Sequence, residues 1–268
     1  MCNYKSGFYT LDDLEFYWKL REMDIADLKE KFTPHYYENA FDHLLSPVMT
    51  APGHVGLFSW GLIPWYTKGL DQALVIRNQT VNAISEEMFE KPAYRDSLKD
   101  NKRCLIPATG FFEWQWADPG ATKSEKQPYF IHTKNKLFSF AGIWSRWEDK
   151  VNNTEVHTYS ILTCAANPLL EKIHNKKKRM PVIIPDEYLH DWLNPNLSKE
   201  DILAFCKPYD QSLMEAYPID RRVGSTKLKS EEKDVADILK KVEPMAPPEP
   251  EKIKAKKIKG DPGQGSLF

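Results

Sequence analysis

Residues 103–114 read Arg-Cys-Leu-Ile-Pro-Ala-Thr-Gly-Phe-Phe-Glu-Trp. The run is mostly aliphatic and aromatic, which is typical of a buried strand, so a strand is predicted over 103–113. Similar short runs lie on both sides of it and predict further strands over 54–60, 72–77, 129–132, 137–144 and 156–164. The polar segment Thr133–Lys136 is expected to join two of them as a hairpin, and Asn152-Asn153 lies in another turn.

Helical patterns around these strands are mostly short. Apolar residues at near-helical spacing predict one longer helix over 11–32, from Leu11 to Leu28. Short helices are predicted over 85–91, 93–99, 166–174, 186–193 and 199–206, and Pro92 is expected to end the first of them. Because strands do not alternate with helices in βαβ order, the pattern favours an α+β domain around a curved, largely antiparallel sheet.

The composition changes after about residue 224. The stretch from Val242 to the end is rich in Pro, Glu and Lys and holds Phe268 as its single aromatic residue. Such a segment buries too little apolar surface to offset the entropy of ordering it. We therefore expect a folded domain over 2–224 and a disordered tail over 225–268.

Composition sets limits on compartment, cofactors and partners. The formal net charge of the 268 residues is -1, so a nucleic-acid partner would need a local basic surface. No apolar run approaches the ~20 residues that span a bilayer, and the N-terminus lacks a signal-peptide core, so a cytoplasmic location without membrane contact is expected. None of the four cysteines forms a CxxC pair, so neither zinc nor another cofactor is expected. The chain is expected to be monomeric.

Cys2 directly follows the initiator Met. A small second residue permits removal of Met1, which would leave a free α-amine beside the thiol. The amine of such a 1,2-aminothiol has an ordinary pKa of about 7.7–8.0 and can add to an aldehyde near neutral pH. The thiolate can then close onto the imine carbon to give a thiazolidine ring. Taken alone, Cys2 is also compatible with an ordinary cysteine that has no catalytic role.

Four further segments accompany the Met-Cys start: Trp60–Trp65, Asn82–Glu86 with Phe89–Pro92, Arg103–Trp114, and Ile173-His174 with Arg179–Ile184. In this order they resemble the SOS-response-associated peptidase (SRAP) family of abasic-site-processing proteins, from residue 2 to about 222. The resemblance implies a barrel-like sheet and a basic groove for single-stranded DNA that carries abasic sites. It implies a covalent thiazolidine cross-link to the ring-opened abasic site.

Carried over residue by residue, the resemblance makes Cys2 the nucleophile, Asn82 a polar anchor, and Glu113 and His174 acid/base groups. A positioned acid or base contributes roughly 10²- to 10⁴-fold to a proton-transfer step, and imidazole titrates near neutral pH. The residues expected to contact DNA are Arg77, Trp60, Trp65, Arg103 and Arg179. The run Lys176–Lys178 fits either a phosphate contact or a solvated loop.

The chain departs from the family pattern at three places. It has Cys2-Asn3-Tyr4 where the family often begins Cys-Gly-Arg, and Asn82-Ala83-Ile84 where the family often has Asn-Ala-Arg. Both changes remove an arginine. The loop from Asn175 to Lys178 is longer and more basic than in many members.

The last five residues, Gln264-Gly-Ser-Leu-Phe268, resemble a short bacterial motif that docks in the replicative sliding clamp, with Gly265 where Leu is usual. Gln264, Leu267 and Phe268 would be the anchors, and such docking would place the protein at the nucleoid. The alternative is an ordinary frayed end. Two other functions also stay open at this point: a thiol peptidase that uses Cys2, and a non-covalent single-strand binder.

Overall fold

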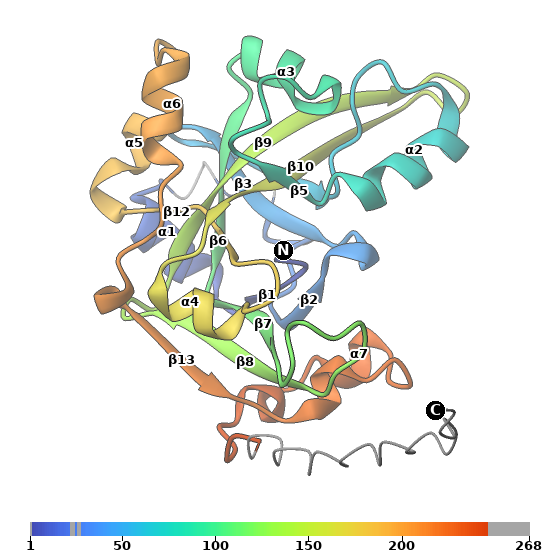
Figure 1. Cartoon of the computed structure of the whole chain (residues 1–268). Coiled ribbons are helices and arrows are strands. Elements are labelled where there is room, and N and C mark those ends of the chain that lie inside the picture. Colours follow the sequence, from blue (N-terminus) through green and yellow to red (C-terminus); the bar gives the residue numbers. More distant parts are fainter. Residues whose placement is uncertain (1, 22–24, 26–27, 246–268) are drawn as a thin grey trace, which may run out of the picture.

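The computed structural model describes residues 2–21, 25 and 28–245. Its centre is a closed ring of five strands in which the last pairs back with the first (Figure 1). In ring order they are β10 (Thr154–Ala165), β4 (His54–Trp60), β3 (Leu45–Ala51), β6 (Arg103–Ala108) and β9 (Phe138–Asp149). The β10–β4 pair is parallel and the other four pairs are antiparallel. The expected curved, barrel-like and largely antiparallel sheet is confirmed.

Further strands extend the ring, and a second sheet lies beside it. β5 (Asn82–Ile84) pairs in parallel with β10, β11 (Arg179–Pro181) pairs with β10, and β12 (Ile183–Ile184) pairs with β9. The second sheet is antiparallel, in the order β13 (Met214–Pro218), β8 (Lys126–Thr133), β7 (Gly110–Trp116), β1 (Tyr4–Gly7) and β2 (His35–Asn39).

The stretch 103–114 joins the two sheets, because it forms two strands where the sequence predicted one. β6 belongs to the ring and β7 to the second sheet, and the change occurs at Thr109, whose N–H donates to Ser6 O at 2.8 Å. Gly110 is required here, since a Cβ on it would lie 2.1 Å from the ring of Phe130. The bend carries Glu113 out of the ring and into the second sheet beside β1.

The predicted hairpin at Thr133–Lys136 is wrong. β8 pairs with β7 and β13, whereas β9 pairs with β6, β10 and β12, so this segment crosses between sheets. The long hairpin of the molecule is β9–β10, and the predicted turn at Asn152-Asn153 closes it with Asn153 in the left-handed region (φ 51°). Local polarity marked both turns, but pairing depends on partners distant in sequence.

Helix α1 (Leu11–Trp18) is shorter than predicted. Thr10 caps it in a capping box with Asp13, and the helix stops at Lys19, which adopts φ 52°. Ile25 and Leu28 are buried as their spacing suggested, yet residues 19–21 are not helical. The apolar spacing therefore identified core positions correctly without a continuous helix.

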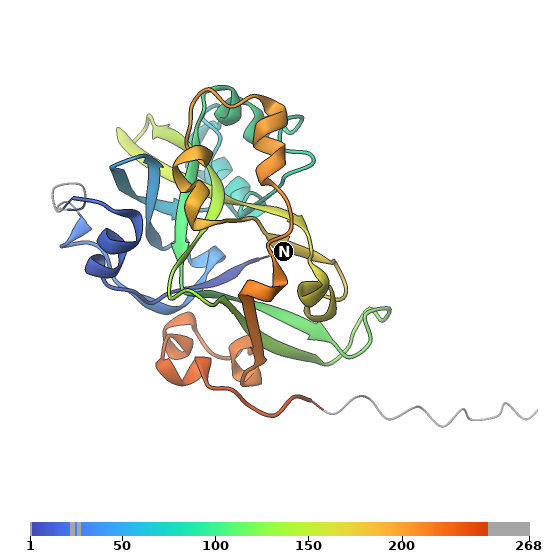
Figure 2. The same cartoon turned by 90° about the vertical axis from the view of Figure 1, so that its left-hand side faces the viewer.

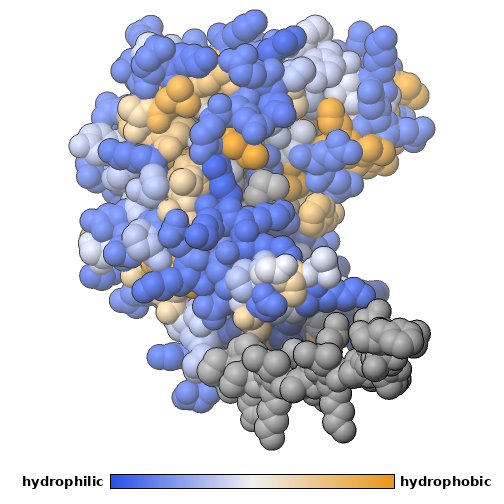
Figure 3. Space-filling view, in the orientation of Figure 1, coloured by the Kyte–Doolittle hydropathy of each residue, from blue (hydrophilic) through white to orange (hydrophobic). Residues whose placement is uncertain are grey.

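Residues 72–77, predicted as a strand, lie in helix α2 (Gly69–Gln79). A short apolar run does not distinguish a strand from a helix. On α2 it is Ala73 that is buried, while Leu74 and Val75 face solvent at 47% and 61% exposure. Figure 3 shows apolar residues at this edge of the molecule.

The predicted helix over 85–91 is a series of turns, and Pro92 begins the next helix instead of ending one. Proline suits a first helical position because its missing N–H would be unpaired there. The remaining helices match their predictions: α3 (Pro92–Lys99), α4 (Pro168–Ile173), α5 (Leu189–Trp192, after a 3-10 turn over Asp186–Tyr188) and α6 (Lys199–Phe205). Among the described helices, none is long and apolar enough to cross a bilayer.

Residues 225–245 differ from the expected disordered tail. They hold α7 (Ser230–Lys233) and a 3-10 turn over Ala236–Leu239, and Ile238 is fully buried. Asp234 fastens this segment to β2 by accepting from the N–H groups of Tyr36 and Tyr37 at 2.6 and 3.1 Å. Figure 2 shows it beneath the second sheet. The rest of the predicted tail, 246–268, lies outside the described residues.

Candidate active site

Cys2 lies at the start of β1, the strand between β2 and β7. Its side chain is fully buried, and its Sγ donates weakly to Tyr4 O at 3.7 Å. The neighbouring Asn3 O accepts from Ala40 N at 2.9 Å, which ties this end of the chain to the turn after β2. Burial, and secondly the negative charge of Glu113, raise the pKa of the Cys2 thiol far above its ordinary value. The thiol therefore needs a base to become a nucleophile.

A buried ion pair holds β1 in place behind Cys2. Lys5 Nζ lies 2.7 Å from Glu38 Oε2, and Ser46 Oγ donates to the same oxygen at 3.0 Å. Gly7 permits this arrangement, because a Cβ there would lie 2.1 Å from Glu38 Oε1. Breaking such a pair leaves an uncompensated buried charge, so β1 and its N-terminal end are held rigidly.

Glu113 reaches the same point from β7. The antiparallel register pairs Lys5 with Phe111, so the two strands bring Glu113 towards the N-terminal end of β1. Glu113 is only 4% exposed, and its charge acts on both Cys2 and His174. A carboxyl group in this position can take up or deliver a proton between the thiol and the imidazole.

His174 comes from the end of α4. Asn167 caps the start of this short helix by accepting from Leu170 N at 2.9 Å, and His174 N donates to Leu170 O at 2.7 Å at its end. The His174 Nδ1 lies 2.8 Å from Arg179 O. A carbonyl oxygen only accepts, so Nδ1 carries the hydrogen in the neutral ring and Nε2 is the basic nitrogen.

The basic Nε2 of His174 faces Glu113, with 3.7 Å between it and Glu113 Oε2. Burial lowers the pKa of His174 below its ordinary value, although the Glu113 charge partly opposes this. The imidazole is therefore neutral and able to accept a proton at neutral pH.

Asn82 lies on β5, which the parallel pairing with β10 places beside the start of β1. Its Nδ2 donates to Asn3 Oδ1 at 2.9 Å, and its backbone carbonyl accepts from Tyr94 OH at 3.0 Å. Among the described residues, Asn82 Oδ1 is buried without a hydrogen-bond partner. A buried amide oxygen of this kind is ready to accept from an N–H group one residue away from Asn3.

These four residues come from four separate elements and gather at one place, as the sequence predicted for Cys2, Asn82, Glu113 and His174. A cavity of about 370 Å³ leads to them from the surface. Its walls are Tyr4, Glu113, Trp114, Trp116, Lys126, His174, Lys176, Lys177 and Gly224. Two of the predicted proton-transfer groups thus form part of an open, mostly aromatic and basic pocket.

The residues predicted to contact DNA have different places in the fold. Trp60 is a core residue: it is 2% exposed, it stacks on Tyr159, and its Nε1 donates to Val81 O at 2.9 Å. A side chain enclosed in this way has no face for a base. Arg103 is likewise 1% exposed and donates to the carbonyls of Trp192 and Asn194. Its conserved charge satisfies backbone groups, so both expectations are corrected.

Three other predicted contacts lie nearer the surface. Arg179 makes a bidentate pair with Glu86 at 2.7 Å for each bond. Arg77 is half-buried, with Nη2 donating to Ser59 Oγ at 2.5 Å. Trp65 is 61% exposed, with Nε1 donating to Asp96 at 3.1 Å. Of the five, Trp65 is the one that presents a largely open side chain.

Sequence reasoning missed three residues that shape the site. Asn3 is the partner of Asn82, and Asn175 binds both backbone groups of Trp116, accepting from its N–H at 3.0 Å and donating to its carbonyl at 2.8 Å. Only the loop length around Asn175 hinted at its role. The predicted clamp anchors Gln264, Leu267 and Phe268 lie outside the described residues.

Comparison with known proteins places this arrangement in a family. The model of the SOS response associated peptidase (SRAP) family matches residues 1–226. The abasic site processing protein YoqW of Bacillus subtilis (strain 168) is 40% identical over 237 residues, covering 87% of this chain and 98% of YoqW. The abasic site processing protein HMCES of Xenopus tropicalis is 27% identical over 241 residues, covering 78% of this chain and 68% of HMCES.

A solved structure agrees with this assignment. The X-ray crystal structure of a protein from Bacteroides thetaiotaomicron superposes with a TM-score of 0.79 at 34% identity, covering 90% of this chain and all of that one. The fold, the order of the motifs and the relatives are therefore consistent with one another. The chain belongs to the SRAP family.

Proposed function

We propose that this chain processes abasic sites in single-stranded DNA by forming a covalent thiazolidine cross-link through Cys2, after removal of Met1. The observation that carries the proposal is the meeting of Cys2 with Glu113, whose charge also acts on His174, in a buried centre. The named function of the relatives, abasic site processing, supports the choice of substrate.

The reaction joins two groups of Cys2 to one aldehyde carbon. The α-amine adds to the ring-opened sugar aldehyde, and loss of one water gives an imine. The thiol sulfur then adds to the imine carbon while its proton passes to a base and a proton is delivered to the nitrogen. The net change is loss of one water and formation of one C–N and one C–S bond.

The four residues divide this work. Glu113 or the neutral His174 accepts the thiol proton, which matters because burial raises the pKa of the thiol. The same pair can protonate the departing hydroxyl when the imine forms. Asn82 Oδ1, buried without a partner among the described residues, accepts from the α-amine of Cys2 and orients its lone pair. The aldehyde enters through the cavity that Glu113 and His174 line.

The direct test incubates the mature protein with an oligonucleotide that holds one abasic site. We expect a heat- and detergent-stable adduct whose intact mass equals protein plus DNA minus one water. Cys2→Ala should form none. Cys206→Ala is the matched control, because Cys206 is a partly buried thiol at the end of α6. Absence of an adduct from protein that has lost Met1 would overturn the proposal.

A thiol peptidase is less compatible with the site. Such enzymes use an accessible cysteine whose pKa is lowered to give a thiolate. Here burial and Glu113 raise the pKa of the Cys2 thiol. Turnover of an unrelated peptide that Cys2→Ser abolishes would favour the peptidase instead. A purely non-covalent binder would bind intact and abasic strands equally, without an adduct.

We also propose that the C-terminal residues Gln264–Phe268 dock in a bacterial sliding clamp, which would bring the protein to replicating DNA. Two apolar anchors, Leu267 and Phe268, follow a polar residue in a peptide-like end. A peptide of this sequence should bind the clamp, and Leu267→Ala with Phe268→Ala should remove binding. Equal binding of the altered peptide would refute the motif.

A further inference from the structure

The mouth of the reactive cavity carries a group of lysines arranged around one tryptophan. Lys126 Nζ lies 4.2 Å from the centroid of the Trp116 ring, and Lys176 Nζ lies 3.7 Å from it. Lys177 lines the same cavity. A cation over an indole is held in place by the ring quadrupole while it keeps its charge. Both ammonium groups therefore stay available to an anion.

The tryptophan itself is fixed to the loop that follows His174. The side-chain amide of Asn175 binds both the N–H and the carbonyl of Trp116, as one strand would bind another. Gln115 Nε2 donates to Lys172 O at 3.0 Å, which adds a second tie. Lys176 Nζ also donates to Ala121 O at 2.8 Å in the β7–β8 turn. The long basic loop and the turn thus form one connected unit.

The charges of the cavity are arranged from inside to outside. The acidic residue that lines it, Glu113, is buried at the inner end, while the three lysines stand at the rim. Glu125, the neighbour of Lys126 in the chain, lies 3.4 Å from Arg221 instead. An anion at the rim therefore meets three positive charges, and the reacting groups lie just behind them.

We propose that Lys126 and Lys176, positioned by Trp116, bind the phosphodiester groups that flank the abasic site. The inference rests on the proposed function, since it assigns the backbone next to the reacting sugar. Phosphate contacts hold a nucleic acid in register without reading its sequence. The chain lacks the two arginines that its family often places at positions 4 and 84, and this lysine pair supplies positive charge beside Tyr4.

The test measures non-covalent affinity against salt concentration, with Cys2→Ala as background so that no adduct forms. Each phosphate contact on a single strand contributes a slope of about -0.7 to log K against log salt. Lys126→Gln with Lys176→Gln should therefore reduce the magnitude of the slope by about 1.4, twice that single-contact value, on intact and abasic strands alike. Lys126→Arg with Lys176→Arg should restore it, because arginine keeps the charge and also stacks on aromatic rings.

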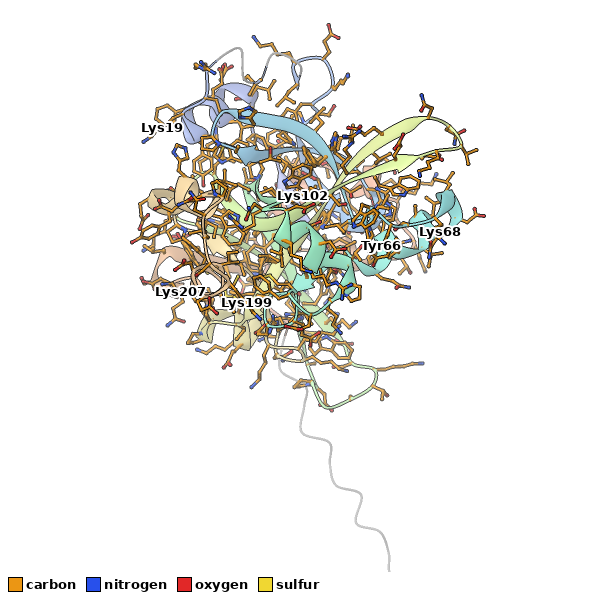
Figure 4. All side chains as sticks on the ribbon, turned by 90° about the horizontal axis from the view of Figure 1, so that it is seen from above. Lys19, Tyr66, Lys68, Lys102, Lys199 and Lys207 are labelled. Carbon is orange, nitrogen blue, oxygen red and sulfur yellow. The ribbon has the colours of Figure 1, made fainter. Side chains whose placement is uncertain are left out.

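The matched control is Lys102→Gln. Lys102 also lies over a tryptophan, Trp144, at 5.8 Å, and it lies 2.8 Å from Asp100. Figure 4 shows Lys102 on the upper side of the molecule, next to α3, whereas the β7–β8 turn lies at the lower end in Figure 1. Lys102→Gln should leave the slope unchanged.

A slope unchanged in the Lys126→Gln, Lys176→Gln protein, or reduced equally by Lys102→Gln, would overturn the clamp. Trp116→Leu provides a second check, because it removes the π face but no charge. It should weaken affinity several-fold, and Trp116→Phe should recover it. Failure of the wild-type chain to form an adduct would instead count against the proposed function, since the binding experiment involves no chemistry.

Discussion

Two carboxylate partners bracket the same loop and behave differently. At one end Glu86 meets Arg179 in a bidentate pair, with both bonds at 2.7 Å. At the other end Glu113 meets His174 at 3.7 Å, with both side chains nearly enclosed. The first pair is short and permanently charged. The second is looser and includes a group that titrates near neutral pH.

The electrostatics separate the two pairs further. Hydrogen bonds from Arg179 lower the pKa of Glu86 to about 2, so this carboxylate stays charged at all physiological pH values. Burial lowers the pKa of His174, so the imidazole stays neutral and can receive a proton. Close, charge-saturated pairing thus fastens the loop, while a looser buried pair leaves room for proton transfer.

The largest expected effect concerns the looser pair. Glu113→Gln keeps the shape of the side chain but removes its capacity to exchange a proton, so cross-linking to an abasic strand should slow by roughly 100-fold. His174→Gln should have a similar effect. Adduct formation followed over time on denaturing gels measures both rates. A rate within twofold of wild type would show that this pair is not the proton relay.

The next effect is the pH dependence of cross-linking. The base must be neutral, and the pKa of His174 lies below its ordinary 6.5. The rate should therefore hold between pH 7 and 6.5 and fall by up to about tenfold per unit only below the lowered pKa. Initial rates across pH 4.5–8 with saturating DNA test this. An acid limb that begins above pH 7 would contradict the assignment.

A smaller effect is expected from the close pair. Arg179→Met removes the bonds to Glu86 and to Thr163 O, so the free energy of unfolding should fall by about 1–3 kcal/mol. His174 Nδ1 binds the backbone carbonyl of residue 179, which the substitution keeps. Denaturant titration measures the loss. If Arg179→Met slowed the reaction as much as His174→Gln at equal folded fraction, the two pairs would not be separable.

The smallest effect is the contribution of Glu86 to acid stability. Its folded pKa lies below the unfolded value of about 4.3, so its stabilisation is present above pH 4.3 and is lost as pH falls towards 2. Because the side chain is 53% exposed, solvent screening keeps this term below about 1 kcal/mol. Glu86→Gln should flatten the unfolding free energy between pH 5 and 2.5 by that amount. A steeper fall in Glu86→Gln would contradict the sign.

The fold was predictable in class and in many of its elements. Alternation and apolar runs located most strands and the short helices α3 to α6, because these patterns depend on local burial. The helix α2, the break at Thr109 and the crossing at Thr133–Lys136 escaped prediction. Each depends on which partner a segment meets, and a short run such as 72–77 suits more than one partner.

The site was predictable in its reacting residues and not in its surroundings. Cys2, Asn82, Glu113 and His174 come together as expected from the motifs. Trp60 and Arg103 belong to motifs as well, but the fold uses them inside the core. Residue type alone does not distinguish a tryptophan that meets DNA from one that fills a ring of strands.

The amino-acid order by itself determined which chemistry is available here: a cysteine next to the initiator Met, a carboxyl group between aromatic residues, and a histidine before a basic loop. Only the tertiary structure decided which charges meet. It pairs Glu86 with Arg179, leaves Glu113 to His174, and sets Lys126 and Lys176 around Trp116. Charge interactions depend on distance and burial, and residues far apart in the chain acquire both only when the sheets close.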